Sequence, residues 1–480
     1  MRLLTILITL SCLVTPASAD SGGTSVRGYG SGTAGKGGFV PEAWVAAGPY
    51  LGNKAFGITI EKGLGGAAAI HLLSGRSSAF RLFDFTLLVD PRDALFMTPF
   101  IGALSGASGT GGVGKATSPL PLPSYTNLLG LSLYSQWIVL DNAAKSGLVA
   151  SDGVRVTFTQ GPLVVAAGSR SLFHYVPGQT AVVTINSSLN YNDVQISDDG
   201  SLGFVTGGGF HVFDLTKSPA TRIAGTTFTS GNPNNLSVHP DQSRAYLPIP
   251  HRTQASVQIV DIKKGSRTFG QRIGAVAKVP FNAGDMEGSS ISANGKVLVV
   301  AIMGLAGRRS LLVIDVDPSS ATRDTLIRQI PVNLSGFMTD VDVSPDGAFA
   351  YCCFAQLGVG SDAARILLAN GLVLNHTKFS ADFATDIDLD PRGRFAVIAC
   401  PNSSNLVFID LRPGTGFFKA RVLPPVSRAR FFSVALTPDA TQAVAVGQPA
   451  AGGLYSFDVL TGKILWSVSA PRGGVAIAVR

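Results

Sequence analysis

The sequence is poor in charged residues and in cysteine, and each shortage excludes a class of protein. Asp, Glu, Lys and Arg together make up 14% of the 480 residues, whereas about a quarter is usual for a globular domain. The 45% of hydrophobic residues excludes an intrinsically disordered chain. The four cysteines are too few for a fold that depends on disulfides. The chain must therefore bury most of its surface in an ordinary hydrophobic core.

Long apolar runs and clusters of basic residues are missing as well. After the first 20 residues no segment approaches the roughly 20 apolar residues of a membrane-spanning helix. We therefore expect no transmembrane helix in the mature chain. The formal net charge is +8, but Lys and Arg occur at most in pairs. Because nucleic-acid-binding proteins concentrate their positive charge, we expect no nucleic-acid partner.

The familiar catalytic and metal-binding motifs are absent too. No G-x-S-x-G element occurs, and the six histidines form no close pair of metal ligands. Residues 109–116, GTGGVGKA, come near a phosphate-binding loop, but Ala116 stands where Ser or Thr would hold magnesium. The proline-rich segment that follows cannot form the helix that such a loop needs. The sequence therefore assigns no catalytic residue.

The first residues have the pattern of a secretory signal peptide. Arg2 precedes a short apolar run, residues 3–14, and Ala17-Ser18-Ala19 is a small-residue cleavage site. We predict that residues 1–19 are a signal peptide and that the protein is exported to the periplasm, the cell surface or the medium of a bacterium. Residues 20–39 are rich in Gly and Ser, which predicts a flexible leader.

Six repeats of one plan occupy the C-terminal two-thirds of the chain. Each consists of a short alternating strand, a turn such as Ser-Pro-Asp-Gly, a second strand and a third strand that mostly ends in Asp. The repeats are 42 to 53 residues apart and begin at Asp193, Asn235, Gly288, Asp340, Asp386 and Ser433. This spacing is typical of a four-stranded propeller blade.

The two ends of this region predict a seventh blade. Residues 473–480 have the pattern of one inner strand, and residues 163–167, 171–176 and 181–185 have the pattern of three outer strands. Joining them would close the ring and remove its open edges. The sequence thus predicts a seven-bladed β-propeller over residues 161–480, closed by its N- and C-terminal strands.

The repeat units resemble a known family. DVDVSPDG (340–347), DIDLDPRG (386–393) and SVALTPDA (433–440) are each followed by a strand and then by a strand like "IDL". These segments are similar to the WD-like YVTN-type repeats of bacterial exported and surface proteins, which are related to the lactonase-type seven-bladed propellers. The resemblance covers residues 160–480 and implies the fold, but it implies no particular activity.

Residues 40–160 follow another pattern. Strand-like runs at 56–60, 83–90, 131–141 and 154–158 are separated by Gly, Ser and Pro turns, which predicts a small β-sandwich-like domain. This segment resembles a Gly-rich β-domain of exported proteins from planctomycete-like bacteria, a family without an assigned activity. The whole chain is therefore predicted to be all-β.

Acidic residues recur where the inner strands begin. Asp193, Asp340 and Asp386 occupy equivalent positions in their repeats. Asp342 and Asp388 follow two residues later, and Asp285 and Glu287 precede the third inner strand. Because the inner strands of a propeller surround its channel, we expect these carboxylates at one mouth of the channel. They could hold calcium, or a basic or polyhydroxylated ligand. Alternatively, each carboxylate caps a turn or forms a hydrogen bond between blades.

Two cysteines lie at similar places in adjacent repeats. Cys353 and Cys400 follow the turn glycines of their repeats by six and seven residues. A disulfide between adjacent strands is one outcome. Burial as free thiols is the other.

Two functions remain open at this point. The first is an exported, non-enzymatic binding or scaffold protein whose propeller recognises an extracellular protein, a glycan or a surface polymer. The second is a lactonase-like hydrolase that uses the channel carboxylates as base or metal ligands. The lack of a catalytic signature favours the first, and no cofactor beyond calcium is expected.

Overall fold

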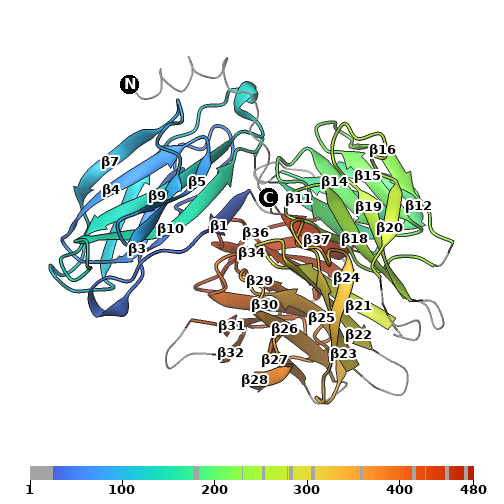
Figure 1. The fold of residues 1–480 in the computed structure, drawn as a ribbon. Helices are drawn as coiled ribbons and strands as arrows, with labels where there is room; N and C mark the ends of the chain where they lie inside the picture. The colour runs from blue at the N-terminus through green and yellow to red at the C-terminus, as the bar shows by residue number, and fades with distance from the viewer. Residues whose placement is uncertain are drawn as a thin grey trace. The chain divides into compact units, whose positions relative to one another are not determined.

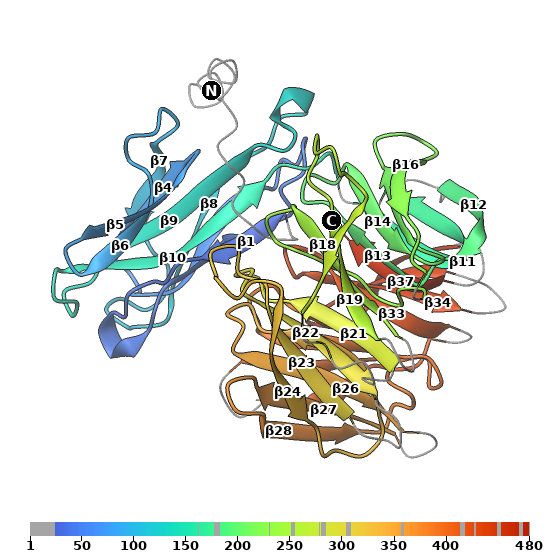
Figure 2. The same cartoon turned by 45° about the vertical axis from the view of Figure 1, so that its right-hand side comes forward.

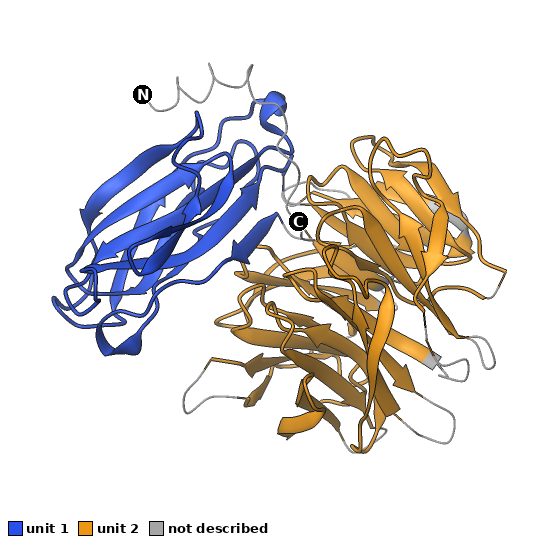
Figure 3. Ribbon diagram, in the orientation of Figure 1, with its two compact units in different colours: residues 1–19, 24–162 blue, residues 20–23, 163–480 orange. Residues whose placement is uncertain are grey.

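The computed structural model describes residues 25–161, 163–176, 183–229, 231–250, 255–277, 279, 285–303, 309–356, 360–412, 418–426, 429–448, 453–469 and 474–479. Regular structure in this part is β-strand, apart from two short 3-10 helices, η1 (Lys36–Gly38) and η2 (Thr126–Leu128). The predicted all-β class is therefore confirmed. The chain divides into two compact units, residues 24–162 and residues 163–480 (Figure 3). The predicted signal segment, residues 1–19, lies outside the described residues.

The N-terminal unit is a sandwich of antiparallel strands (Figure 1). The larger sheet has the order β1-β10-β9-β4-β7, the smaller sheet has the order β2-β3-β8, and β5 and β6 form a separate hairpin. The strands are β1 (Val26–Tyr29), β2 (Glu42–Val45), β3 (Gly57–Gly63), β4 (Ala68–Ser74), β5 (Ser77–Leu82), β6 (Phe85–Val89), β7 (Met97–Ala103), β8 (Gly114–Pro119), β9 (Ser132–Leu140) and β10 (Leu148–Thr157). The predicted β-sandwich is therefore confirmed.

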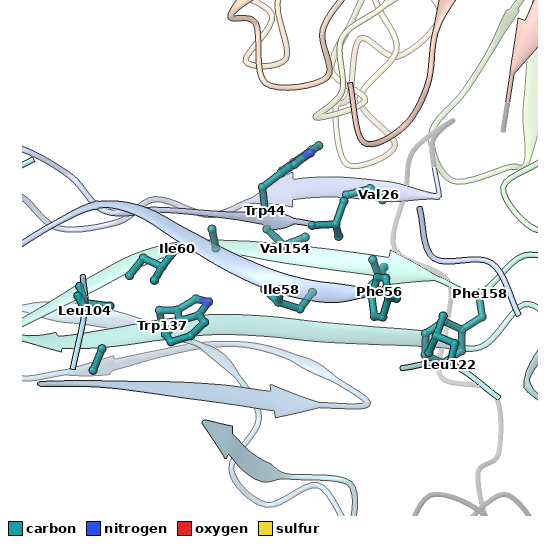
Figure 4. Packing of buried hydrophobic residues seen from close by; sticks show 14 of the residues in the cluster. Val26, Trp44, Phe56, Ile58, Ile60, Leu104, Leu122, Trp137, Val154 and Phe158 are labelled. Carbon is teal, nitrogen blue, oxygen red and sulfur yellow. The ribbon is translucent and has the colours of Figure 1, made fainter. Parts of the chain in front are cut away.

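Apolar side chains from both sheets fill the core of this sandwich (Figure 4). Trp137 on β9 and Ile58 on β3 are fully buried, and Phe56 packs edge to face against Phe158 with 6.4 Å between ring centroids. Each such side chain contributes about 1.5–3 kcal/mol when it leaves water. His71 is also fully buried and stacks on Trp137 at 4.6 Å.

The glycine-rich segment before the sandwich corrects the expectation of a flexible leader. Residues 26–29 form β1, where Val26 pairs with Val156 of β10 and is fully buried. The glycines here allow close packing, because a Cβ at Gly32 would lie 2.8 Å from the carbonyl oxygen of Ala150. Composition alone does not distinguish such glycines from those of a flexible linker.

The C-terminal unit contains six four-stranded antiparallel sheets, one for each repeat (Figures 1 and 2). Within each sheet the strands follow chain order from the inner to the outer strand. The blades are β13 (Asp193–Ile196), β14 (Leu202–Thr206), β15 (Phe210–Asp214) and β16 (Thr221–Thr226); β17 (Ser237–Val238), β18 (Arg244–Ile249), β19 (Ser256–Asp261) and β20 (Arg272–Ala275); β21 (Asp285–Ile291), β22 (Val297–Met303), β23 (Arg309–Asp315) and β24 (Thr325–Pro331); β25 (Phe337–Val343), β26 (Phe349–Ala355), β27 (Ser361–Leu367) and β28 (Leu372–Phe379); β29 (Asp386–Leu389), β30 (Phe395–Cys400), β31 (Asn405–Asp410) and β32 (Ala420–Val422); and β33 (Arg430–Leu436), β34 (Gln442–Gln448), β35 (Gly453–Asp458) and β36 (Ile464–Ser469). We call these blades 1 to 6.

Two turns of each blade explain why the repeat motif recurs. The turn from the first to the second strand needs a residue with positive φ, which is Gly347 (74°) in blade 4 but Gln242 (56°) in blade 2 and Ala440 (59°) in blade 6. The Asp that ends the third strand accepts a backbone N–H from the next turn, as Asp315 does from Asp317 N at 3.0 Å. These recurrent acids therefore close turns.

The seventh blade joins segments that lie far apart in the sequence. β37 (Gly474–Val479) pairs antiparallel with β11 (Val164–Tyr175), which pairs with β12 (Val183–Asn190). Inner strand β37 also contacts β13 on one side and β33 on the other, so the ring is closed (Figure 2). The two predicted outer strands 163–167 and 171–176 are instead one strand, β11, whose register shifts near Gly168. The described part of this blade therefore has three strands, and the seven-bladed fold is confirmed.

The outermost strands share one irregularity. In five of the six full blades the register of the fourth strand shifts by one residue, and the residue at the shift is an exposed aliphatic one. These residues are Ile223, Ile273, Ile327, Leu374 and Leu465, with 40% to 52% of their surface exposed. A bulge interrupts the ladder of backbone groups that an edge strand would otherwise offer to another chain.

None of the helices in the described part of the chain has the length and apolarity of a membrane-spanning helix.

Candidate functional site

The predicted acidic residues lie on the inner strands of the propeller. Asp193 begins β13, Asp340 and Asp342 lie on β25, and Asp386 and Asp388 lie on β29. Burial raises the pKa of Asp193 to about 7, and the charge of Asp386, four blades further along the chain, raises it as well. The structure thus brings these five carboxylates together on the inner strands, where the charge of Asp386 acts on the pKa of each of the other four.

In three blades the carboxylate at the first repeat position binds the backbone of the next blade. Asp193 Oδ2 accepts a hydrogen bond from Leu236 N at 2.8 Å. Asp340 Oδ2 accepts one from Ile387 N at 3.0 Å, and Asp386 Oδ2 accepts one from Val434 N at 2.8 Å. In each case the donor follows the equivalent position of the next blade by one residue.

The second position of the inner strands repeats this arrangement. Asp342 Oδ2 accepts a hydrogen bond from Leu389 N at 2.9 Å, and Asp388 Oδ2 accepts one from Leu436 N at 2.6 Å. Asp342 also accepts a hydrogen bond from the hydroxyl of Ser290 in the preceding blade. Two rows of side-chain acceptors therefore join neighbouring blades around the channel, and we call these two rows the inter-blade ladder.

Several members of the inter-blade ladder are not acids, and sequence reasoning did not assign them a role. Gln195 Oε1 accepts a hydrogen bond from Val238 N at 3.0 Å. Ser433 Oγ accepts one from Ile477 N of β37 at 3.2 Å and so ties blade 6 to the composite blade. The signal was present in the sequence, because these residues occupy the same two repeat positions as the acids. Their different chemistry hid the shared function.

Burial of the ladder carboxyls favours their protonated forms. Burial raises the pKa of Asp342 to about 6, although the Ser290 hydroxyl and two backbone N–H groups oppose the change. Burial raises the pKa of Asp340 well above its usual range, and the charge of Asp386 and a hydrogen bond shared with that carboxyl raise it further. Burial and the charge of Asp342 raise the pKa of Asp388 in the same way. A protonated carboxyl can accept a backbone N–H and donate to its neighbour at once.

The remaining two predicted acids belong to β21 in blade 3. Asp285 is the first residue of that strand, and its side chain lies outside the described part of the structure. Glu287 lies half-buried two residues later. Gly288 fills the repeat position where other blades carry Asp. A Cβ there would come within 2.0 Å of Asp340 Oδ1, so the next blade's carboxyl occupies this space.

The described residues show no group of three or more His, Cys, Asp and Glu side chains placed to hold a metal ion. The five channel carboxylates are directed to backbone N–H groups of the following blade. The sequence left two roles open for these acids, a ligand or ion site and hydrogen bonds between blades. The structure contains the hydrogen bonds between blades. A calcium site at the channel mouth stays a prediction.

The three cysteines of the propeller are buried free thiols. Cys353 and Cys400 form no disulfide, and burial together with the charge of Asp340 raises the pKa of Cys353 well above its usual range. A buried thiol of this kind is a poor nucleophile. The glycine-rich motif at 109–116 runs into strand β8 rather than a helix, so the structure agrees with its exclusion as a phosphate-binding loop.

Comparison with known proteins places the fold. No family model matches the sequence, and no curated protein matches it. The periplasmic gluconolactonase of Pseudomonas aeruginosa is 16% identical over 66% of this chain and 98% of its own, with a TM-score of 0.52. A putative 6-phosphogluconolactonase from Bacteroides fragilis is 14% identical over 67% of this chain and 98% of its own, with a TM-score of 0.51.

A protein of unknown function from Desulfotomaculum acetoxidans is 16% identical over 66% of this chain and 98% of its own, with a TM-score of 0.51. Similarity at this level of identity concerns the fold and not the activity. The further resemblance of residues 40–160 to a domain of planctomycete-like bacteria stays a prediction. Residues 163–479 thus form a seven-bladed β-propeller with the fold of the lactonase-like propellers, as the repeats predict.

Proposed function

We propose that the protein is an exported binding or scaffold protein without enzymatic activity, whose propeller recognises an extracellular protein, a glycan or a surface polymer. One observation carries this proposal: the polar groups that line the channel are used to join the blades. Asp340, Asp386, Asp342 and Asp388 each accept a backbone N–H from the next blade. A carboxylate held in this way supports the ring and is not directed toward a substrate.

The rigid ring also suits a binding platform. Each blade packs apolar side chains against both neighbours, as Val299 of blade 3 and Phe354 of blade 4 do in one shared cluster. Binding residues of proteins are often carried on loops that a rigid scaffold of this kind positions.

The test is a capture experiment with two readouts. The purified mature protein is incubated with glycan arrays and with cell-envelope fractions, and a sugar-lactone hydrolysis assay is run in parallel. The proposal expects saturable capture by at least one polymer or envelope component and no lactone hydrolysis above the buffer rate. Hydrolysis above that rate without capture would refute it.

A second function is favoured by one specific observation. The pKa values of Asp193, about 7, and Asp342, about 6, lie near the neutral range that suits a general base. Two solved structures with this fold carry the names of gluconolactonases. Under this alternative, replacement of Asp342 by Asn would abolish lactone hydrolysis while the propeller stays folded.

A further inference from the structure

A cavity in blade 3, separate from the channel residues, has the chemistry of a ligand site. It lies where β23 begins and β24 ends and has a volume of about 650 Å³. Its lining consists of Arg309, Ser310, Gln329, Pro331, Val332, Asn333 and Leu334. Pockets of roughly 300–1,000 Å³ are typical for small organic ligands. The volume therefore suits one or two sugar rings.

The guanidinium of Arg309 is the charged group of this cavity. Its Nη1 donates a hydrogen bond to the carbonyl oxygen of Leu334 at 2.6 Å, which fixes the side chain against the loop after β24. Its Nε is buried and has no hydrogen-bond partner in the described part of the chain. A guanidinium carries five N–H donors, and Leu334 uses one of them, so the terminal nitrogens keep donors for a bound anion, whereas the buried Nε is out of its reach.

The other polar groups are uncharged and supply both donors and acceptors. Gln329 Nε2 donates a hydrogen bond to Ser310 Oγ at 2.8 Å, and Ser310 is only 7% exposed. The Ser310 hydroxyl hydrogen and the Gln329 carbonyl oxygen therefore remain to bind ligand hydroxyls. The side-chain amide of Asn333 adds a further donor and acceptor.

Among the described residues that line the cavity there is no carboxylate, so Arg309 gives this lining a positive net charge. A bound anion would meet a charge-assisted donor and no repelling acid, whereas a cation would meet an unpaired guanidinium. Apolar contacts come from Pro331, Val332 and Leu334, which suits the ring carbons of a sugar. One carboxylate and several hydroxyls on a compact ring would satisfy all these groups together.

We propose that this cavity binds an acidic sugar, a uronic acid residue that is free or part of an anionic polysaccharide, with its carboxylate on Arg309. The inference rests on the proposed binding function and narrows its ligand to one class. The described lining comes from β23, β24 and the loop after β24, and it includes none of the ladder residues.

The experiment is calorimetric titration of the full mature protein with D-glucuronate and with trigalacturonate, and with D-glucose as the neutral probe. We expect the wild type to bind the acids at least tenfold more tightly than glucose, and we expect this binding to weaken as salt is added. Arg309→Gln should weaken acid binding at least tenfold. Arg272→Gln, which removes a basic residue from the outer strand of blade 2, should leave it unchanged.

A second variant protects the test against a folding defect, because Arg309 also holds the loop through Leu334. Gln329→Ala leaves that bond in place and should still weaken binding of both acids several-fold, with an unchanged melting temperature. Equal binding of glucose and glucuronate by the wild type, or equal acid binding by the wild type and Arg309→Gln, would overturn the inference. If a surface polymer captures the wild type but glucuronate does not bind, the acidic-sugar site is wrong and the proposed binding function stands. If neither polymer capture nor glucuronate binding is found, the proposed function is wrong as well.

Discussion

Replacing Asp340 by Asn should make the propeller more stable at pH 8 and should flatten the pH dependence of its unfolding. Asp340 is 8% exposed, and its oxygen Oδ2 accepts the backbone N–H of Ile387. Burial and the neighbouring Asp386 raise the pKa of this carboxyl well above its usual range. Asn keeps an oxygen for Ile387 and supplies an N–H where the protonated carboxyl supplies an O–H.

The sign follows from the direction of the pKa change. A carboxyl whose pKa is raised in the folded state contributes stability at low pH, and this stability is lost as the pH rises toward the folded-state value. For one such carboxyl the loss is at most about 1.4 kcal/mol per pH unit, and so at most about 2 kcal/mol between pH 6.5 and 8. Asp193, whose pKa is raised to about 7, adds about 1 kcal/mol before allowance for the solvent that reaches it.

The window is chosen so that histidine does not interfere. Burial lowers the pKa values of His174 and His211 in the propeller, and the resulting loss of stability occurs as the pH falls below their ordinary value of 6.5. Above pH 6.5 the ladder carboxyls should dominate. We expect wild-type stability to fall by more than about 1 kcal/mol between pH 6.5 and 8, because Asp340 and Asp388 add to the loss from Asp193. Asp340→Asn should remove up to about 2 kcal/mol of that fall.

The assay is urea unfolding at several pH values, followed by pulsed hydrogen exchange on peptides from residues 163–479 so that the propeller is measured by itself. Asp439→Asn is the matched control, because it changes an Asp in a turn where blade 3 already carries Asn294. Its slope with pH should equal that of the wild type. A wild-type propeller whose stability is constant or rises from pH 6.5 to 8, or an Asp340→Asn variant with the wild-type slope, would refute the reasoning.

Three further predictions concern packing and titration elsewhere. Gly288→Ala should destabilise the propeller by about 2 kcal/mol or more, measured by thermal unfolding, because its Cβ would meet Asp340 Oδ1 at 2.0 Å; an unchanged melting temperature would show that this space is open. His71→Phe should remove a loss of about 4 kcal/mol that the sandwich otherwise suffers between pH 6.5 and 3, because burial lowers the pKa of His71 to about 3; acid unfolding followed by exchange on peptides from residues 25–161 measures this, and an unchanged acid midpoint would contradict it. The propeller thiols are buried and free, so they should resist a thiol reagent in the native protein and should all react in denaturant; they are Cys352, Cys353 and Cys400. If only one thiol reacts in denaturant, the other two form a disulfide.

Most of the fold follows from the sequence because each blade carries its own local signals. The alternation before each turn, the positive-φ position in the turn and the Asp that ends the third strand all act within about 20 residues of one another. The composite blade was less predictable, since residues 163–167 and 171–176 have the pattern of two strands but form one, β11. β1 was missed for a related reason, because what orders Val26 is its pairing with Val156, far along the chain.

The predicted acids Asp193, Asp340 and Asp386 lie on inner strands, but their hydrogen bonds between blades could not be derived from the sequence. Asp193 is paired with Leu236 and Asp340 with Ile387, and such partners lie one whole repeat away. The same placement would serve an ion site, so repeat position alone cannot separate the two roles. The cavity of Arg309 depends on the course of the loop after β24, which lies outside the repeat pattern, and a lone Arg at the start of a strand gives no signal in a sequence.

The joining of β37 to β11 has a consequence for how the molecule is made. β11 begins at Val164 and β37 at Gly474, so the strand that closes the ring is synthesised about 310 residues after its partner. At about 5–20 residues per second, the edge of β11 waits for roughly 15 to 60 s without that partner. Until β37 is made, β11 has no inner strand to pair with and the ring stays open. The ring can therefore close only after residues 474–479 have been made, however early the other blades form.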